Sequence, residues 1–410
     1  MNTNRTVSCR ATAATRWTKA RALYWSLCAL GIAVAASAGE GSPQFITFDA
    51  PGAGAIPGAY QGTGCLNFID CSVVLNKHGA ITGYYLAANN VYHGFVRSPE
   101  GEFTTFDAPG ADTTPGSFNG TDPYAINDLG VITGAYSDVN GVHGFLRSPE
   151  GAFTTFDVPG GSLLTIPVAL NLEGSVVGSV LDQNAVWHAF LRKRDGTFKT
   201  FSAPGGCDTS FSTSGCTGTG ALSINVSGTI SGGYADNNLV LHGLVRSPEG
   251  KLTTFDAPGA GAVPGSYQGT SCVDCAAPLN QFGVIAGYYI DANYVVHGFL
   301  RSPRGEIRTF DAPPDAGSFG FGCSGACPLG LNDSGAITGS YQDANNVWHG
   351  FVRSPEGKFT TFDAPGADNT PGLGNGTFPV SINEQGAIAG FYLDKNEVNH
   401  GFLRLPAEDD

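Results

Sequence analysis

The sequence has little positive charge. It contains 21 Lys and Arg against 35 Asp and Glu, which gives a formal net charge of −14. An acidic surface repels nucleic acid phosphates and anionic lipid headgroups, so neither is an expected partner. The chain also has no apolar run after residue 38 that approaches the length of about 20 residues needed to cross a membrane. We therefore expect no membrane span in the mature chain.

Motifs for nucleophilic, metal-dependent and phosphate chemistry are also missing. There is no Gly-x-Ser-x-Gly, no His-Glu-x-x-His and no Gly-Lys-Ser/Thr, the signatures of serine hydrolases, zinc proteases and phosphate-binding loops. No catalytic residue and no metal ligand is predicted on this basis. Acids are plentiful, however, and their separation in space is not visible in a sequence. A pair of carboxylates for glycoside cleavage therefore remains open.

The first 38 residues have the features of a secretory signal peptide. Basic residues without any acid precede an apolar run at 22–36, and Ala36-Ser37-Ala38 follows as a small-residue cleavage pattern. The apolar run is shorter than a membrane span of about 20 residues. We expect residues 1–38 to be removed and the protein to be secreted, periplasmic or on the cell surface. The alternative is an uncleaved N-terminal anchor.

The cysteines of the mature chain fall into four close pairs. An even number in local pairs after a signal peptide predicts local disulfides. A zinc site built from the third and fourth pairs is the alternative, but the spacings of the first two pairs are not those of zinc knuckles. The predicted pairs are Cys65 with Cys71, Cys207 with Cys216, Cys272 with Cys275, and Cys323 with Cys327.

A unit of about 50 residues recurs seven times. One copy runs from Ala125-Ile126-Asn127 through His143-Gly144-Phe145-Leu146-Arg147 to Phe156-Asp157. Short segments rich in Val, Ile, Phe, Tyr and Thr alternate with Gly, Pro, Asn and Asp, so each unit predicts four short strands. The histidine of each unit marks the period: His93, His143, His188, His242, His297, His349 and His400.

Seven four-stranded units predict an all-β fold, a seven-bladed β-propeller that spans residues 39–410 as one domain. The chain ends support closure of the ring. The mature chain opens with a fourth strand, Phe45-Ile46-Thr47-Phe48, and finishes with a third strand at 400–404. The N-terminal strand can therefore complete the last blade and protect its edge. An open repeat array is the alternative, and it would need capping units that the sequence does not contain.

These repeats resemble the bacterial extracellular HAF-repeat family, which is named for a His-Ala-Phe core. The literal core is His188-Ala189-Phe190 in the third unit, and the other units have His-Gly-Phe or, in the fourth, His242-Gly243-Leu244. The resemblance covers all seven units, from about Phe45 to Arg404. It implies an exported, propeller-like fold and no established activity.

The repeated histidines predict structural pairs. In the first unit a turn at Ser98-Pro99-Glu100-Gly101 sets a register that places His93 on the third strand opposite an acid on the fourth. The same register places five further histidines opposite an acid, and His188 opposite Ser202. Such a pair holds the imidazole and satisfies a half-buried polar group. The predicted pairs are His93 with Asp107, His143 with Asp157, His242 with Asp256, His297 with Asp311, His349 with Asp363 and His400 with Asp49.

Two other residues or motifs recur in the units: an Arg after the core Phe, and an Asp-x-Asn between the second and third strands. The Arg two residues after each core Phe is expected to pack its stem on an aromatic ring and to keep its guanidinium in solvent. The Asp-x-Asn of six hairpins, such as Asp138-Val139-Asn140, is expected to form a turn. Calcium is the weaker alternative there, because the spacing lacks the Gly and the distal Glu of an EF-hand loop. No other cofactor is expected.

The connections between units vary, and they contain every predicted disulfide. Long loops on a rigid scaffold are where binding usually occurs. We expect a monomeric binding or scaffold propeller whose loop-rich face engages a glycan, a peptide or a cell-envelope component. The alternative is a secreted lyase or glycosidase that acts on polysaccharide at the mouth of the channel. The candidate ligand contacts are Tyr60, Gln61, Tyr124, Tyr267, Gln268, Phe319 and Phe321.

Overall fold

A computed structural model describes residues 42–64, 73–208, 217–270, 277–313, 316, 325–372 and 375–407. By its internal contacts the chain divides into residues 1–40 and 41–410, and all described residues belong to the second part. These residues form strands and turns, as the sequence predicts. Among them there is no helix, and thus none that could cross a membrane.

The second and third strands of each unit form a tight antiparallel hairpin. Second strands such as β4 are buried along their whole length because they are covered on both faces. The second strands are β4 (Ile81–Leu86), β8 (Ile132–Ser137), β12 (Val176–Asp182), β16 (Ile230–Ala235), β20 (Ile285–Ile290), β24 (Ile337–Gln342) and β28 (Ile388–Leu393). The third strands are β5 (Tyr92–Arg97), β9 (Val142–Arg147), β13 (Trp187–Arg192), β17 (Leu241–Arg246), β21 (Val296–Arg301), β25 (Trp348–Arg353) and β29 (Asn399–Leu405).

The fourth strand of each unit pairs with the third. In the first unit Arg97 lies opposite Phe103 and Phe95 opposite Thr105, which is the register that the Ser-Pro-Glu-Gly turn predicts. In the seventh unit the partner is the N-terminal strand, which runs antiparallel to β29 from Gln44↔Leu405 to Phe48↔Gly401. The fourth strands are β6 (Phe103–Phe106), β10 (Phe153–Phe156), β14 (Phe198–Phe201), β18 (Leu252–Phe255), β22 (Ile307–Phe310), β26 (Phe359–Phe362) and β1 (Gln44–Phe48).

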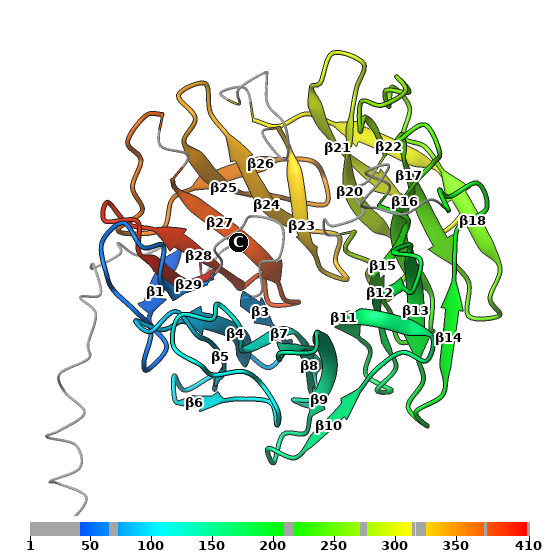
Figure 1. Cartoon of the computed structure of the whole chain (residues 1–410). Coiled ribbons are helices and arrows are strands. Elements are labelled where there is room, and N and C mark those ends of the chain that lie inside the picture. The colour runs from blue at the N-terminus through cyan, green and yellow to red at the C-terminus, as the bar shows by residue number, and fades with distance from the viewer. Residues whose placement is uncertain are drawn as a thin grey trace, which may run out of the picture. The chain divides into compact units, whose positions relative to one another are not determined.

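The first strands are less regular and lie nearest the middle of the arrangement, with the fourth strands at its periphery (Figure 1). In the first unit this strand is split in two, and in the fifth only a short piece is regular. The first strands are β2 (Gly62–Thr63) with β3 (Val73–Leu75), β7 (Thr121–Ile126), β11 (Gly161–Leu170), β15 (Thr219–Ile224), β19 (Gly269–Thr270), β23 (Cys327–Leu331) and β27 (Thr377–Ile382).

Single parallel pairings join neighbouring units into larger sheets. Gly62 of β2 pairs with Asn399 of β29, Leu164 of β11 with Val142 of β9, and Gly269 of β19 with Leu241 of β17. Through these pairings the strands form one nine-stranded, two eight-stranded and one four-stranded sheet within the described residues. Adjacent units are therefore linked by backbone hydrogen bonds as well as by packed side chains.

Each repeated Arg lies over a Phe ring from the fourth strand of the preceding unit, 4.5–5.3 Å from the ring centre. The expectation of a solvated guanidinium is wrong. These arginines are buried, apart from the half-buried Arg353, because the neighbouring unit covers them. Burial lowers the pKa of Arg97, Arg147, Arg192, Arg246, Arg301 and Arg353. The contacts are Arg97 over Phe48, Arg147 over Phe106, Arg192 over Phe156, Arg246 over Phe201, Arg301 over Phe255, Arg353 over Phe310 and Arg404 over Phe362.

The Asn that follows each first strand forms a second series of contacts between units. Its Oδ1 accepts amides of its own turn, as Asn280 does from Phe282 and Val284. Its Nδ2 donates to the carbonyl of the next Asn, from Asn76 to Asn127 and onward to Asn383, at 3.0–3.3 Å. The seventh unit also contacts the first, because the Leu75 amide donates to Ser381 Oγ at 2.9 Å.

Candidate functional site

The connections between strands lie on two faces. The turn-rich face contains the Asn-x-x-Gly turns and the Ser-Pro-Glu-Gly turns. We call the opposite side the loop-rich face: it contains the hairpins between second and third strands and the connections from each fourth strand to the next unit. The chain reverses direction at each turn. The connection after every second strand and the connection after every fourth strand therefore lie at the same end of the sheets. The predicted histidine pairs belong to this face, as do Tyr60, Gln61, Tyr267 and Gln268 among the predicted ligand contacts.

The histidine of every unit lies within hydrogen-bonding distance of the residue predicted to face it. Nδ1 of His93 is 2.8 Å from Asp107 Oδ1, and the other five acidic pairs have distances of 2.6–2.8 Å. His188 is 2.7 Å from Ser202 Oγ. The geometry places one carboxylate, at the end of a fourth strand, against each of six imidazole rings.

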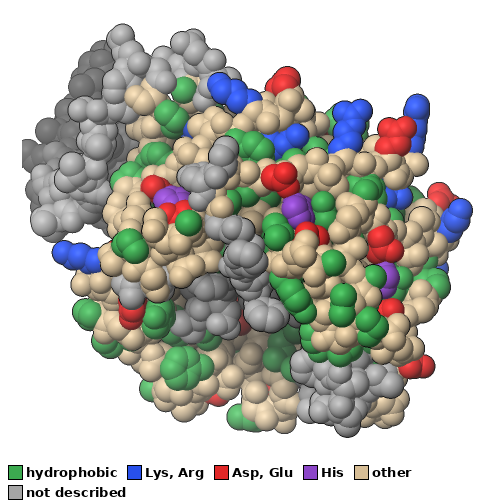
Figure 2. All heavy atoms as spheres, turned by 90° about the horizontal axis from the view of Figure 1, so that it is seen from above, with side chains coloured by type: hydrophobic (Ala, Val, Ile, Leu, Met, Phe, Trp, Pro, Cys, Tyr) green, Lys and Arg blue, Asp and Glu red, His purple; other side chains and the backbone are tan. Residues whose placement is uncertain are grey.

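Two further partners of the histidines were not predicted. Nε2 faces the hairpin Asp of the same unit, 3.2 Å away for His143 and Asp138 and 3.3–3.8 Å away in the five other hairpins with an Asp. A Tyr of the second strand packs on the ring in six units, stacked in four of them, as Tyr289 is on His297, and tilted in the other two. Figure 2 shows histidines flanked by carboxylates. The sequence does place a Tyr at a nearly constant spacing before the histidine, a signal that could have revealed this contact.

The carboxylates favour the charged form of several imidazoles. The hydrogen bond with Asp256 raises the pKa of His242, and the hydrogen bond with Asp363 does the same for His349, against an opposing effect of burial. For Asp138, hydrogen bonds from Asn140, Gly141 and His143 outweigh burial and lower the pKa to about 2. These groups stabilise one another's charges, as expected of structural pairs.

The hairpin Asp also organises its own turn. Asp182 Oδ1 accepts the amides of Asn184 and Val186 at 2.8 Å, and the other five hairpins repeat the first of these bonds. Such local bonds are those of an Asx-turn. In the part of the chain that the structure describes, no group of three or more His, Cys, Asp or Glu is arranged to hold a metal ion.

Four connections contain a second Pro-Gly, further along the connection, and dock there on the hairpin of the preceding unit. In each of them the Gly amide donates to an Asn carbonyl of that hairpin at 2.6–2.8 Å: Gly58 to Asn396, Gly116 to Asn89, Gly265 to Asn238 and Gly372 to Asn345. These loops therefore extend across the junction between two units, and their tips lie on the loop-rich face.

Three of these four loops hold an aromatic side chain two residues after the Gly. Tyr60, Phe118 and Tyr267 have φ of 51°, 54° and 52°, in the left-handed region. Their exposures are 41%, 53% and 38%. The sequence of the fourth loop has Gly374 at this position, a residue that adopts positive φ without cost. Phe118 was not among the predicted contacts, although an alignment of the four loops would have identified it.

The other predicted contacts differ in accessibility. Gln61 and Gln268 are 1% exposed; their Nε2 atoms donate to Asn90 Oδ1 at 2.8 Å and to the Ala292 carbonyl at 3.3 Å. They fasten loops, so a ligand in solvent would not reach them. Tyr124 is half-buried in β7. Phe319 and Phe321 lie outside the described residues.

The two faces differ in charge. Across all hairpins and connections of the loop-rich face, Lys395 is the sole Lys or Arg in the sequence. Acids are frequent there, including the six that pair with histidine and the six of the hairpins. The other turns contain Lys77, Lys193, Arg194, Lys251, Arg304 and Lys358. The net negative charge of the protein is thus concentrated at one end of the sheets.

Only part of the predicted disulfide pattern falls on described residues. Cys207 and Cys327 are each disulfide-bonded. The partners predicted for them, Cys216 and Cys323, lie outside the described residues, so both pairings stay predictions. The two remaining pairs lie wholly outside the described residues and also stay predictions: Cys65 with Cys71, and Cys272 with Cys275.

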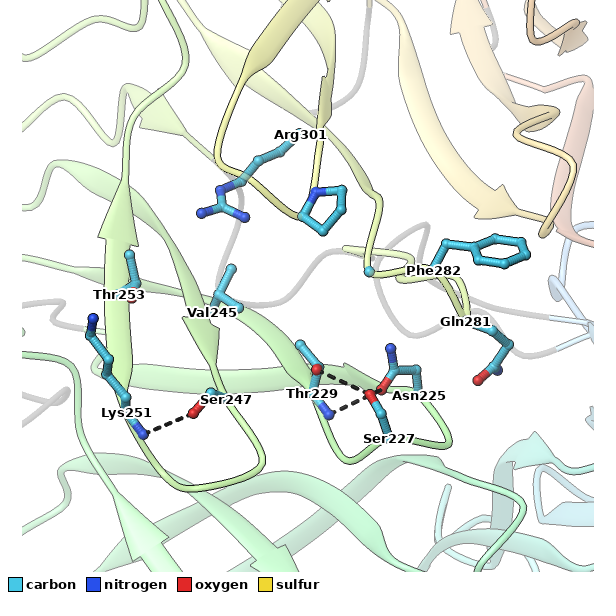
Figure 3. A pocket seen from close by; sticks show the side chains of 12 residues that line it. Asn225, Ser227, Thr229, Val245, Ser247, Lys251, Thr253, Gln281, Phe282 and Arg301 are labelled. Carbon is cyan, nitrogen blue, oxygen red and sulfur yellow. Dashed lines mark hydrogen bonds between the residues drawn. The ribbon is translucent and has the colours of Figure 1, made fainter.

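A cavity of about 320 Å³ lies on the turn-rich face, between the fourth and fifth units (Figure 3). Its wall contains Lys251 and Arg301 and no carboxylate. Arg301 is occupied, since it lies over Phe255 and Nη1 donates to the Ser302 carbonyl at 3.2 Å. Ser227 donates to Asn225 at 2.7 Å within the same wall. The cavity is therefore lined by groups of the repeated frame and is separate from the loop-rich face.

No known family model matches the chain, and no curated protein is similar to it in sequence. Solved structures are similar in fold. A streptogramin B lyase aligns with a TM-score of 0.50 and 13% identity, over 90% of this chain and 100% of that chain. A catalytically inactive virginiamycin B lyase from Staphylococcus aureus with quinupristin gives 0.52 and 11%, over 89% and 100%. The fold is β-propeller-like. At these identities the similarity shows the fold alone.

Proposed function

We propose that this chain is an exported, seven-bladed β-propeller that binds an extracellular or cell-envelope partner through its loop-rich face. The series of Arg–Phe contacts supports seven blades in a closed ring. Each Arg contacts the preceding unit, and Arg97 of the first unit contacts Phe48 of the strand paired with the last. Following these contacts through seven units returns to the starting unit. The signal-like N-terminus and the bonded Cys207 and Cys327 support export.

The observation that carries the binding function is the conformation of Tyr60, Phe118 and Tyr267. A non-glycine residue in the left-handed region costs about 1–2 kcal/mol. Residues held at this cost cluster at binding sites. Gly would avoid the cost, and the fourth loop has Gly. The Tyr60 side chain also hydrogen-bonds Glu397 within the fold, and we infer that the exposed rings serve in addition a contact outside the fold.

The composition of the loops supports the same function. They are rich in Gly, Ser, Asn, Gln, Thr and Tyr, as in the loop from Val263 to Gly269. Binding surfaces of antibodies combine these residues, because Tyr gives a large rigid contact area and the small polar residues adapt their hydrogen bonds. Docking on the preceding hairpin fixes the loop tips before a partner arrives, which lowers the entropy cost of binding.

The test replaces the three rings by the residue of the fourth loop. The secreted wild-type chain and a Tyr60→Gly/Phe118→Gly/Tyr267→Gly variant are compared for binding to a panel of cell-envelope glycans and peptides. We expect at least a tenfold loss of binding, about 1.4 kcal/mol. We also expect an unchanged or higher melting temperature, because Gly relieves the backbone cost.

A matched control removes exposed apolar side chains from the other face. Leu129 and Phe282 are 62% and 69% exposed on the turn-rich face, and a Leu129→Ser/Phe282→Ser variant should bind as the wild type does. A triple Gly variant that melts lower and binds normally would assign the rings to loop packing and reject the proposed site.

A further inference from the structure

Each exposed ring shares its connection with an exposed carboxylate. The connection that begins at Asp49 carries Tyr60, the one at Asp107 carries Phe118, and the one at Asp256 carries Tyr267. These three aspartates are 54%, 41% and 56% exposed while their histidines hold them in place. The same combination of an aromatic ring and a carboxylate is therefore presented at three junctions.

An aromatic face and a carboxylate attract the same kind of group. The ring quadrupole attracts a Lys ammonium or an Arg guanidinium, and the carboxylate accepts charge-assisted hydrogen bonds from it. With Lys395 the sole Lys or Arg in the surrounding connections, no cation of the face itself competes for most of these positions. The charge of the face is thus complementary to a cationic partner.

We propose that the partner of the loop-rich face is a polypeptide segment rich in Lys and Arg, held by these ring and carboxylate combinations. The proposal rests on the binding function proposed above and identifies the class of partner. Acidic polysaccharides and anionic lipids would be repelled by the face. A neutral glycan could stack on the rings but would gain nothing from the concentration of carboxylates.

The test uses a labelled decalysine peptide as the probe, with decaglutamate and a neutral glycan panel beside it. An Asp49→Asn/Asp107→Asn/Asp256→Asn variant removes three charges from the face and keeps an oxygen for each histidine. The control, Glu100→Gln/Glu150→Gln/Glu356→Gln, removes three charges from turns of the other face. The triple Gly variant of Tyr60, Phe118 and Tyr267 removes the rings without changing the charge.

We expect decalysine binding to weaken about tenfold in the Asp→Asn variant and in the triple Gly variant, and less than twofold in the control. Added salt should weaken it further, since exposed charges are screened. Equal losses in the Asp→Asn variant and the control would mean attraction to overall charge and would overturn the inference. So would decalysine binding that is unaffected by loss of the rings.

Failure of the inference is distinguishable from failure of the proposed function. If the rings bind a neutral glycan without dependence on salt, the loop-rich face is still a binding surface and the cationic partner is wrong. If loss of the rings changes no interaction of any kind, the proposed binding function fails as well.

Discussion

The two faces of this molecule are built on the same strands but differ in how strictly they repeat. On the turn-rich face the Asn-x-x-Gly turn recurs in every unit, and each Arg contacts a Phe of the unit before it. On the loop-rich face the connections differ in length, in cysteine content and in whether they carry an exposed ring. Identical contacts at every junction hold the repeated units together. Differences between junctions are what a partner can recognise.

The largest expected difference in stability is between variants that remove a buried aromatic ring and variants that remove an exposed one. Phe299 is fully buried on β21, and its ring lies 5.8 Å from that of Phe255. Phe299→Ala should lower the free energy of unfolding by about 3–5 kcal/mol, because it leaves a cavity between two units. Urea unfolding measures this, with Tyr267→Gly as the exposed counterpart, for which we expect no loss. Similar losses in the two variants would remove the distinction between frame and binding surface.

A smaller effect is expected where Gly meets the Phe of the fourth strand. A Cβ placed on Gly243 would lie only 2.3 Å from Phe255, so Gly243→Ala should destabilise by about 1–3 kcal/mol through overpacking. The third unit has Ala189 opposite Phe201, and there the strands already accommodate the methyl group. Ala189→Gly should therefore cost about 1 kcal/mol or less. If Gly243→Ala unfolds like the wild type, close packing is not the reason for His-Gly-Phe.

The smallest effect concerns pH. The folded state raises the pKa of His242 and His349 above 6.5, so their stabilising contribution is complete below pH 6.5 and is lost as pH rises through the raised pKa. Between pH 8.5 and 6 the wild type should gain about 1–2 °C more in melting temperature than His242→Asn/His349→Asn. Differential scanning calorimetry measures the difference. His78→Asn, outside the repeated position, should behave as the wild type does, and an identical pH profile for the double variant would count against charged pairs.

Contacts within one unit could be predicted from the sequence. The four-residue turn between third and fourth strands fixes the register, so the residues that face His93 and Phe95 could be counted from Ser98-Pro99-Glu100-Gly101. The all-β composition and the short strands follow from the same local pattern. Local rules suffice here because the two strands of the hairpin follow each other directly, with His93 and Asp107 only 14 positions apart.

Contacts between units could not be predicted in the same way. The burial of Arg97 depends on Phe48 of β1, a strand that pairs with β29 at the other end of the chain. The burial of Gln61 depends on the hairpin that contains Asn90. Sequence alone treats an Arg or a Gln as a surface residue, because it does not show which neighbour covers it. Phe118 was missed for another reason: its significance lies in its φ, which becomes visible when the loop adopts its folded geometry.

The pairing of β1 with β29 has a consequence for the order of folding. His400 and Asp49 are separated by 351 positions yet lie 2.8 Å apart. During synthesis β1 must therefore wait for β29 before its partner exists. Contacts this distant in sequence form slowly, and until then β1 presents an unpaired edge. A chain that stops short of residue 399 would retain most of its repeated units yet leave β1 without its partner strand.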